Sequence, residues 1–245
     1  MGNGDIQSRI IYLLLLLPPL VAAFTIHEFA HAWTGNWLGD DAARRQGRLT
    51  LDPLAHLDPF GSIMILIALF TNLPLIGWAR PVPFNPRNLP HPRRDAMLIA
   101  VAGPISNVLQ AGIWYALLYG FRIVAERNGA TFTPEDVFGI ITRQADVTSF
   151  VHMLATMMAA GVSVNLGLAA FNMIPFPPLD GHYVLEYLGP PFVSQFYDMV
   201  RPFSFIILFV LIQTPILGTA LRPVSTYTNE VLVHALGYKP DDIYY

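Results

Sequence analysis

Long apolar stretches separated by shorter polar ones dominate the chain. They occupy five ranges: Ile10–Trp37, Phe60–Leu75, Met97–Val124, Phe150–Ile174 and Phe203–Leu221. A helix needs roughly 20 apolar residues to cross the hydrocarbon core of a bilayer, and all but Phe60–Leu75 approach or exceed that length. The pattern therefore predicts an all-α polytopic membrane protein with four to five transmembrane helices. The shorter stretch is expected to be a re-entrant or interfacial segment if it is not a fifth span.

Composition agrees with a membrane location. Of 245 residues, 53% are hydrophobic and 13% are charged, and the charged share is about half that of a typical soluble domain. The formal net charge of −3 gives no indication of a nucleic-acid partner. Because the chain has no cysteine, it offers no thiolate, and any bound metal must be held by His, Asp or Glu.

Arginines gather in two of the polar stretches. Arg44, Arg45 and Arg48 follow the first apolar stretch, and Arg80, Arg87, Arg93 and Arg94 precede the third. The positive-inside rule places both loops in the cytoplasm. A simple span through 60–75 would put them on opposite sides, so we expect this segment to dip in and return, packed against protein or a wet cavity, or to lie along the interface. Four spans then leave 175–201 facing the cytoplasm. Five spans, with one arginine loop outside, are the alternative.

The first apolar stretch contains His27-Glu28-Phe29-Ala30-His31. On a helix, positions i and i+4 lie on one face, so His27 and His31 can bind the same metal ion. In this pattern two imidazoles hold zinc and the intervening Glu28 acts as general base. A chance match and a structural polar cluster are the other interpretations. Ionisable groups inside an apolar span are costly without a partner, which favours the metal site.

Zinc in a catalytic site needs a third protein ligand and an open position. The fourth apolar stretch runs into a proline-rich sequence that ends with Leu179-Asp180-Gly181, and its prolines must end the helix. Asp180 alone would be a turn residue, but beside the histidine motif it becomes the leading candidate for the third ligand. His56 and Asp58 compete for a role near the metal. A cap or turn before Pro59 is the other interpretation of that pair.

Together the two motifs resemble the site-2 protease family of intramembrane zinc metalloproteases. The resemblance rests on His27-Glu28-x-x-His31 and on Asn172-x-x-Pro175 followed by Leu179-Asp180-Gly181. Stretches 47–53, 77–86 and 102–107 resemble the compact prokaryotic branch, which lacks PDZ and CBS domains. The resemblance covers about residues 10–190.

The resemblance implies one Zn²⁺ per chain on His27, His31 and Asp180, with Glu28 as the catalytic base and Asn172 positioning the substrate. His182 departs from the small residue that the family more often has after Asp-Gly. It could support Asp180, and His56 is likewise a possible supporting residue of the site. An interfacial polar residue is the other interpretation of His182.

The function implied is a zinc metalloendopeptidase that hydrolyses peptide bonds in or near transmembrane segments, as in regulated intramembrane proteolysis. Residues 1–245 would form a single membrane-embedded peptidase domain, with a catalytic core at about 10–190, a C-terminal span at 203–221 and a polar tail at 222–245. The expected partners are the lipid bilayer and a transmembrane-helix substrate, in a prokaryotic plasma membrane with the site near the cytoplasmic side. The pattern carries no signal for oligomeric state.

Three alternatives to an intramembrane protease stay open at this point. A catalytically silent scaffold that binds membrane helices would be expected to have a broken ligand set. A zinc transporter would be expected to have several acidic or histidine pairs along a path. A zinc peptidase that acts on soluble peptides at the membrane face would have its site at a shallower depth.

Two further features concern the surroundings of the motifs. Residues 47–53 alternate polar and apolar side chains and could form a short β-hairpin or edge strand that receives an extended substrate. Asn107 and Asn165 lie inside apolar stretches, where hydrogen bonding between helices is the default role. Asn165 and Asn172 are seven residues apart, so we expect them on one helix face that looks toward the site.

Overall fold

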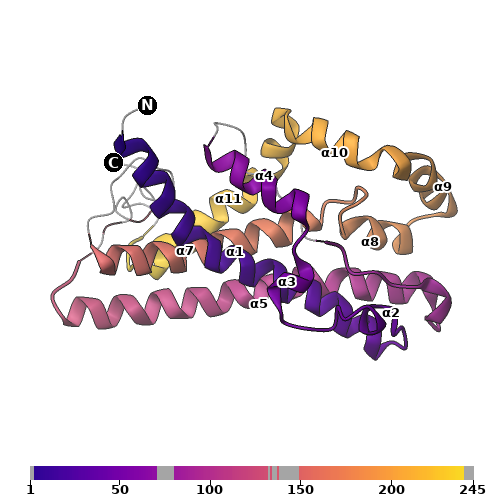
Figure 1. The fold of residues 1–245 in the computed structure, drawn as a ribbon, viewed down its shortest axis with the longest axis horizontal. Coiled ribbons are helices and arrows are strands. Elements are labelled where there is room, and N and C mark those ends of the chain that lie inside the picture. The colour runs from indigo at the N-terminus through magenta and orange to yellow at the C-terminus, as the bar shows by residue number, and fades with distance from the viewer. Residues whose placement is uncertain (1–2, 71–79, 132, 134–136, 138–148, 240–245) are drawn as a thin grey trace.

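The computed structural model describes residues 3–70, 80–131, 133, 137 and 149–239, and the regular structure among them is nearly all helical (Figure 1). The long helices are α1 (Asn3–Trp37), α5 (Pro92–Arg127), α7 (Phe150–Asn172) and α11 (Pro215–Ala235). Shorter ones are α4 (Pro59–Phe70), α8 (Gly181–Leu188), α9 (Pro191–Val200) and α10 (Ser204–Ile212). Single turns are α2 (Ala42–Arg45), α3 (Pro53–His56), η1 (Pro86–Asn88) and η2 (Arg201–Phe203). The predicted all-α class is confirmed.

Four helical stretches among the described residues are long and apolar enough to cross a membrane: Leu13–Trp37, Pro92–Arg127, Phe150–Asn172 and Pro191–Ile212. The first three match the predicted spans. The last begins earlier than expected, because α9, η2 and α10 follow one another without a loop, and it ends at Ile212. The apolar stretch predicted as one span at 203–221 is interrupted at Gln213 and Thr214, ahead of Pro215, which starts α11.

The short apolar stretch at 60–75 is described only as far as residue 70. There it forms α4, a helix of 12 residues, which at 1.5 Å per residue is about 18 Å long. That length is well short of the roughly 30 Å hydrocarbon core. The expected hairpin near 47–53 is not formed. Residues 47–52 have no strand, and Asp52 instead caps α3 by accepting a hydrogen bond from Leu54 N.

Helices α1, α5 and α7 pack against one another and form the centre of the molecule (Figure 1). Their contacting faces are built from small buried residues, among them Ala23 and Ala32 of α1, Ala100 of α5, and Ala155 and Ala159 of α7. Small side chains let helix backbones approach closely in a lipid environment. Large apolar side chains such as Leu109 and Ile113 of α5 and Ile206 of α10 are exposed, as expected for surfaces that face lipid.

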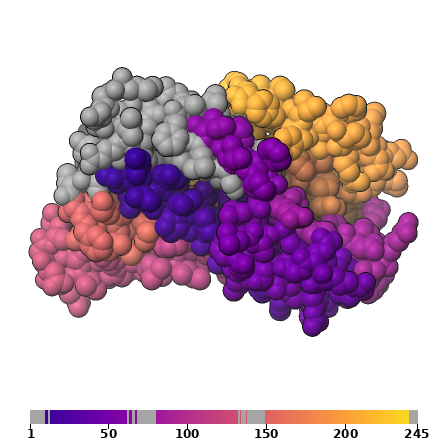
Figure 2. Space-filling model, in the orientation of Figure 1, coloured from indigo at the N-terminus to yellow at the C-terminus, as the bar shows by residue number. Residues whose placement is uncertain are grey.

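The two arginine-rich loops meet at one end of the molecule. The fully buried carboxylate of Asp40, after α1, accepts hydrogen bonds from Asn85 N (2.7 Å) and Asn88 Nδ2 (2.8 Å) ahead of α5. In Figure 2, the purple segments that carry both loops gather at the same end of the view. The topology with both loops on one side of the membrane is therefore the one that fits the fold.

Candidate metal centre

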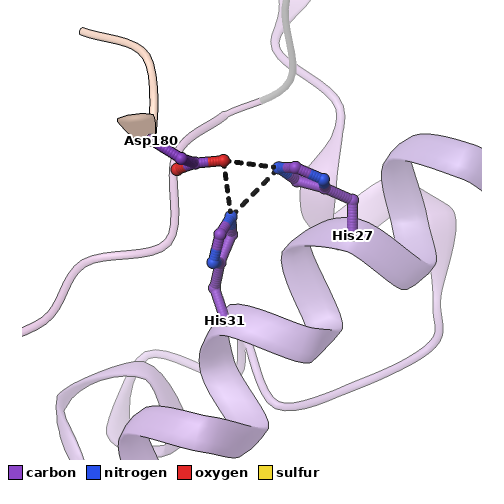
Figure 3. Close-up of side chains that lie close together, drawn as sticks. All are labelled: His27, His31 and Asp180. Atoms are coloured by element: carbon purple, nitrogen blue, oxygen red, sulfur yellow. Dashed lines mark hydrogen bonds and ion pairs between the residues drawn. The ribbon is translucent and has the colours of Figure 1, made fainter. Parts of the chain in front are cut away.

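His27 and His31 lie one turn apart on α1 and point toward Asp180, which directly precedes α8 (Figure 3). Oδ2 of Asp180 lies 3.2 Å from His27 Nε2 and 3.4 Å from His31 Nε2, and the two Nε2 atoms are 3.0 Å apart. Both imidazoles are buried, and the Asp180 side chain is 17% exposed. Within the described residues, these are the three side chains that could share a metal ion.

Asp180 reaches the histidines because the chain turns sharply after α7. Gly181 makes this turn possible. A Cβ atom on it would lie 2.5 Å from the carbonyl carbon of Met173 and 2.7 Å from Ile174 O. Only a residue without a side chain lets the start of α8 close against residues 173 and 174. Leu179, just before Asp180, is buried and anchors the turn.

The other ring nitrogen of each histidine is held by an acceptor. His27 Nδ1 lies 2.6 Å from Asn107 Oδ1, and His31 Nδ1 lies 2.7 Å from Ile99 O, both on α5. Oxygen atoms of this kind only accept, so each Nδ1 carries the hydrogen and donates it. In a neutral imidazole the remaining nitrogen then keeps a lone pair. Two lone pairs and a carboxylate oxygen therefore face one another.

This arrangement fits a zinc ion. Oδ2 of Asp180 is buried and makes no hydrogen bond of good geometry, despite its short distances to the two rings. Three electron-pair donors in contact repel unless a cation lies among them, and two imidazoles with one carboxylate are a common zinc donor set. Gly103 of α5 leaves the space, because a Cβ there would lie 2.5 Å from His31 Cε1 and 2.6 Å from His27 Cε1.

The carboxyl group of Asp180 is held in its ionised form. Burial alone would raise its pKa, but the side chains of His31 and His27 beside it outweigh burial and hold the pKa below its ordinary value. A zinc ion among these side chains would act in the same direction, because it puts positive charge beside the carboxylate. Asp180 therefore offers an anionic donor oxygen at neutral pH.

Glu28 is buried beside His27 and is held by the main chain of a distant loop. Its Oε2 accepts a hydrogen bond from Val82 N (3.1 Å). Arg48, buried behind this loop, fixes it by donating to the carbonyl oxygens of Ala55, Arg80 and Pro81. Burial lowers the pKa of Arg48, and the attraction of Glu28 opposes that shift. The loop thus brings a backbone donor and a buried cation to the acid.

The remaining predicted residues lie around the site without joining the three ligand candidates. His56 is buried, and its Nε2 lies 2.8 Å from Thr50 O while its carbonyl accepts from Arg80 N (2.8 Å), so it ties two loops together. His182 lies 2.6 Å from Leu179 O through Nδ1 and packs on Tyr183 and Tyr197. Burial lowers its pKa.

Asn172 is the last residue of α7 and is half-buried. Its Nδ2 donates to Leu168 O of its own helix (3.0 Å), and its role in substrate positioning stays a prediction.

Five contributors to the site were not assigned a role there from the sequence. Arg48 entered through its charge and Asn107 through helix packing, Asn165 was expected only on a helix face that looks toward the site, and Gly103 entered as part of the stretch 102–107. The main-chain N–H of Val82 has no sequence signature at all. The resemblance of stretches 47–53, 77–86 and 102–107 to one family was the single signal that pointed at these regions, and residues 77–79 lie outside the described part of the chain.

Comparison with known proteins gives consistent matches. The model of the family described as "Peptidase family M50" matches residues 69–211, a range that includes Asp180 and begins after His31. The chain is 37% identical over 227 residues to "Putative zinc metalloprotease YwhC" of Bacillus subtilis (strain 168), covering 89% of this chain and 90% of that protein.

More distant relatives carry a similar name. "Putative zinc metalloprotease Rip2" of Mycolicibacterium smegmatis is 24% identical over 205 residues, which cover 84% of this chain and 69% of that protein. The Rip2 protein of Mycobacterium tuberculosis strain H37Rv is 27% identical over 201 residues, which cover 81% of this chain and 66% of that protein. No solved structure matches the chain.

Proposed function

The chain belongs to peptidase family M50 and is a zinc metalloprotease of the membrane, and we propose that it cleaves transmembrane segments of other membrane proteins within the bilayer. In this proposal His27, His31 and Asp180 hold the zinc ion and Glu28 is the general base. The observation that carries it is the convergence of these three donor side chains on the inner face of a helix long enough to span the membrane.

The depth of the site supports intramembrane cleavage over cleavage at the surface. The candidate span of α1 runs from Leu13 to Trp37. At 1.5 Å per residue, His27 lies about 21 Å from its first residue and about 15 Å from its last. Both distances put His27 in the interior of a helix long enough to cross a core of roughly 30 Å, which supports a deep site. A peptide in water would not reach this depth easily, whereas a substrate segment already in the bilayer would.

Each residue of the site has a defined task in hydrolysis. The chemistry supplied by bound zinc is Lewis acidity toward water and toward the scissile carbonyl. Glu28 takes the proton that the attacking water loses and passes it to the leaving amine nitrogen, so the same proton serves both steps. The Val82 N–H bond to Oε2 fixes the orientation of the Glu28 carboxylate while it does so.

A substrate helix must unwind before it can be cut, because its carbonyl groups are engaged in its own hydrogen bonds. Residues 80–85 form a segment without helix or strand that reaches Glu28 through Val82. We infer that an unwound substrate lies next to this segment, in place of the hairpin expected at 47–53. Regulated intramembrane proteolysis of a membrane-tethered substrate is the physiological process that such a site would serve.

The arginine-rich loops support a site that opens toward the cytoplasm. Their arginines lie at the end of the molecule where α1 ends and α5 begins, which is also the end nearer to His31. Positively charged loops of this kind stay on the cytoplasmic side of a prokaryotic plasma membrane.

The test uses the full-length protein purified in detergent. Zinc per chain and cleavage of a transmembrane substrate are measured for wild type, Glu28→Gln and Asp180→Ala, with Asp198→Ala, an exposed acid, as the control. Glu28→Gln should keep its zinc and lose activity by about 10²- to 10⁴-fold, and Asp180→Ala should lose both. A fully active Glu28→Gln would refute the protease mechanism. Zinc flux into liposomes without cleavage would point to transport instead.

A further inference from the structure

Two asparagines at the centre of the helix bundle form a chain of hydrogen bonds that ends on His27. Asn107 of α5 and Asn165 of α7 are both fully buried, and neither belongs to the ligand set. Asn165 Nδ2 donates to Gly161 O (2.8 Å), Asn107 Nδ2 donates to Asn165 Oδ1 (2.9 Å) and to Ala23 O (3.3 Å), and His27 Nδ1 donates to Asn107 Oδ1 (2.6 Å). The chain thus links all three central helices.

The direction of every bond in this chain is fixed by its ends. The main-chain oxygens of Gly161 and Ala23 can only accept, so they each require an amide NH₂ group. That requirement turns Asn165 Oδ1 toward Asn107 and Asn107 Oδ1 toward His27. An amide rotated by half a turn would put oxygen against oxygen or NH₂ against NH₂. In a fully buried position, such unsatisfied groups are strongly disfavoured.

We propose that Asn107 and Asn165 are positioning residues of the metal centre, which hold His27 in the tautomer whose Nε2 presents its lone pair to zinc. The inference rests on the proposed ligand role of His27. A metal-bound histidine usually donates its second N–H to a carboxylate, a backbone carbonyl or water. His31 follows that rule with Ile99 O, while His27 uses a side-chain amide whose own orientation is set by a second amide on another helix.

Helix packing alone would explain why two asparagines are bonded, but it predicts different behaviour on substitution. Asn107→Leu removes the acceptor for His27 and the bond between the helices. Asn107→Asp keeps an acceptor for His27 and removes only the NH₂ group that bonds Asn165 and Ala23. A packing role predicts equal damage from both variants. A positioning role predicts that the aspartate restores what the leucine loses.

Asn165→Leu provides an independent probe because Asn165 does not touch His27. Without Asn165 Oδ1, only the longer bond to Ala23 O opposes rotation of the Asn107 amide. The rotated amide would offer NH₂ to His27 Nδ1, which would then have to accept, and the ring hydrogen would move to Nε2. This variant should therefore weaken zinc binding through the tautomer. Gln110→Leu, which removes another buried polar side chain of α5, is the matched control.

The experiment measures zinc affinity by competition with a chromophoric chelator on detergent-purified full-length protein, together with the visible spectrum of the cobalt(II)-loaded form and the melting temperature of the metal-free form. Asn107→Leu should lose roughly 10- to 100-fold in zinc affinity, and Asn165→Leu should lose less. Asn107→Asp and Gln110→Leu should stay close to wild type in affinity and spectrum. The metal-free melting temperature should fall in both Asn107 variants.

The outcomes separate this inference from the proposed function. If wild type binds no zinc, the metal site itself fails. If wild type binds zinc and Asn107→Leu binds it as tightly as Gln110→Leu does, the positioning role alone is wrong. Equal losses of zinc affinity in Asn107→Leu and Asn107→Asp would also overturn it, because they would assign the effect to the bond between helices. If Asn107→Leu does not fold, wild-type zinc affinity in Asn165→Leu would overturn the positioning role instead.

Discussion

Gly103 is the position where one added methyl group should empty the metal site. A Cβ atom there would lie 2.5 Å from His31 Cε1 and 2.6 Å from His27 Cε1, while ordinary contacts begin at 3.4 Å. Gly103→Ala therefore requires the two rings to retreat by about 0.8–0.9 Å, or α5 to move away from α1. Zinc ligands tolerate displacements of only about 0.2 Å. Overpacking of this kind typically costs about 1–3 kcal/mol, which corresponds to a roughly 5- to 150-fold weaker affinity.

The assay is zinc affinity by chelator competition, with cleavage of a transmembrane substrate as a second measurement. Gly112→Ala and Gly120→Ala are matched controls on the same helix, because a Cβ at either position would meet no atom within 4 Å. Both should keep the wild-type affinity and gain slightly in helix stability. Wild-type zinc affinity in Gly103→Ala would refute the geometry, since the rings would then not occupy the space beside Gly103.

Three further predictions address the other parts of the site. Gly181→Ala should displace Asp180, because its Cβ would lie 2.5 Å from the Met173 carbonyl carbon, and zinc content should therefore fall. Gly167→Ala is the control and should keep its zinc, because a Cβ there would meet no atom within 4 Å. Val82→Pro removes the N–H that holds Glu28, so turnover should fall while zinc content stays unchanged. Val82→Ala keeps the N–H and should remain active. Loss of zinc in Val82→Pro would contradict the assigned role of this hydrogen bond. Removing zinc with a chelator should lower the melting temperature of wild type. The expected loss in free energy of unfolding is about 2.7 kcal/mol, compared with protein in free zinc at 100 times its Kd. Asp180→Ala should show no such dependence, and a chelator effect of equal size in that variant would exclude Asp180 as a ligand.

The histidine pair could be predicted from the sequence because its geometry is local. Four residues of helix fix the relative positions of His27 and His31 without any tertiary contact. Asp180 is far away in the chain, so helix periodicity said nothing about its distance from them. Its placement could be anticipated only through the cost of a carboxylate beside an apolar span and through the resemblance to a known family.

The expected hairpin at 47–53 shows how a correct signal can be outweighed by a neighbouring one. The alternation of polar and apolar residues is typical of a strand, but it ends in Asp52-Pro53. Aspartate is a favoured N-cap and proline a favoured first residue of a helix, and together they start α3 instead. Arg48 was expected only as part of a cytoplasmic loop, with no prediction of its burial. It is buried because three main-chain carbonyls of the loops around α3 compensate its guanidinium.

The C-terminal span was misplaced for a similar reason. Mean hydropathy is high throughout 203–221, so periodicity and length alone favoured one helix there. Pro215 cannot donate a backbone hydrogen bond inside a helix, and it disfavours helical backbone at the residue before it. The helix ends at Ile212 and a new one begins at Pro215. The proline was visible in the sequence, but nothing indicated that Pro191 would begin a continuous helical stretch before it.

The contribution of α5 to the site is the part that sequence reasoning undervalued, because that helix places no ionisable side chain at the metal. Ile99, Gly103 and Asn107 are spaced four residues apart and therefore follow one stripe of the helix. Along that stripe, Ile99 O fixes the ring of His31, Gly103 leaves room for both rings, and Asn107 fixes the ring of His27. Each of the three acts through an acceptor oxygen or through the absence of a side chain, properties that a search for metal ligands does not detect. The stretch Ala102-Gly103-Pro104-Ile105-Ser106-Asn107 thus combines space and polarity on one face. Helix α5, which its apolar sequence alone would assign to packing and lipid contact, therefore orients both histidine rings. Substitutions along this stripe should alter metal binding more than equally conservative changes elsewhere on α5.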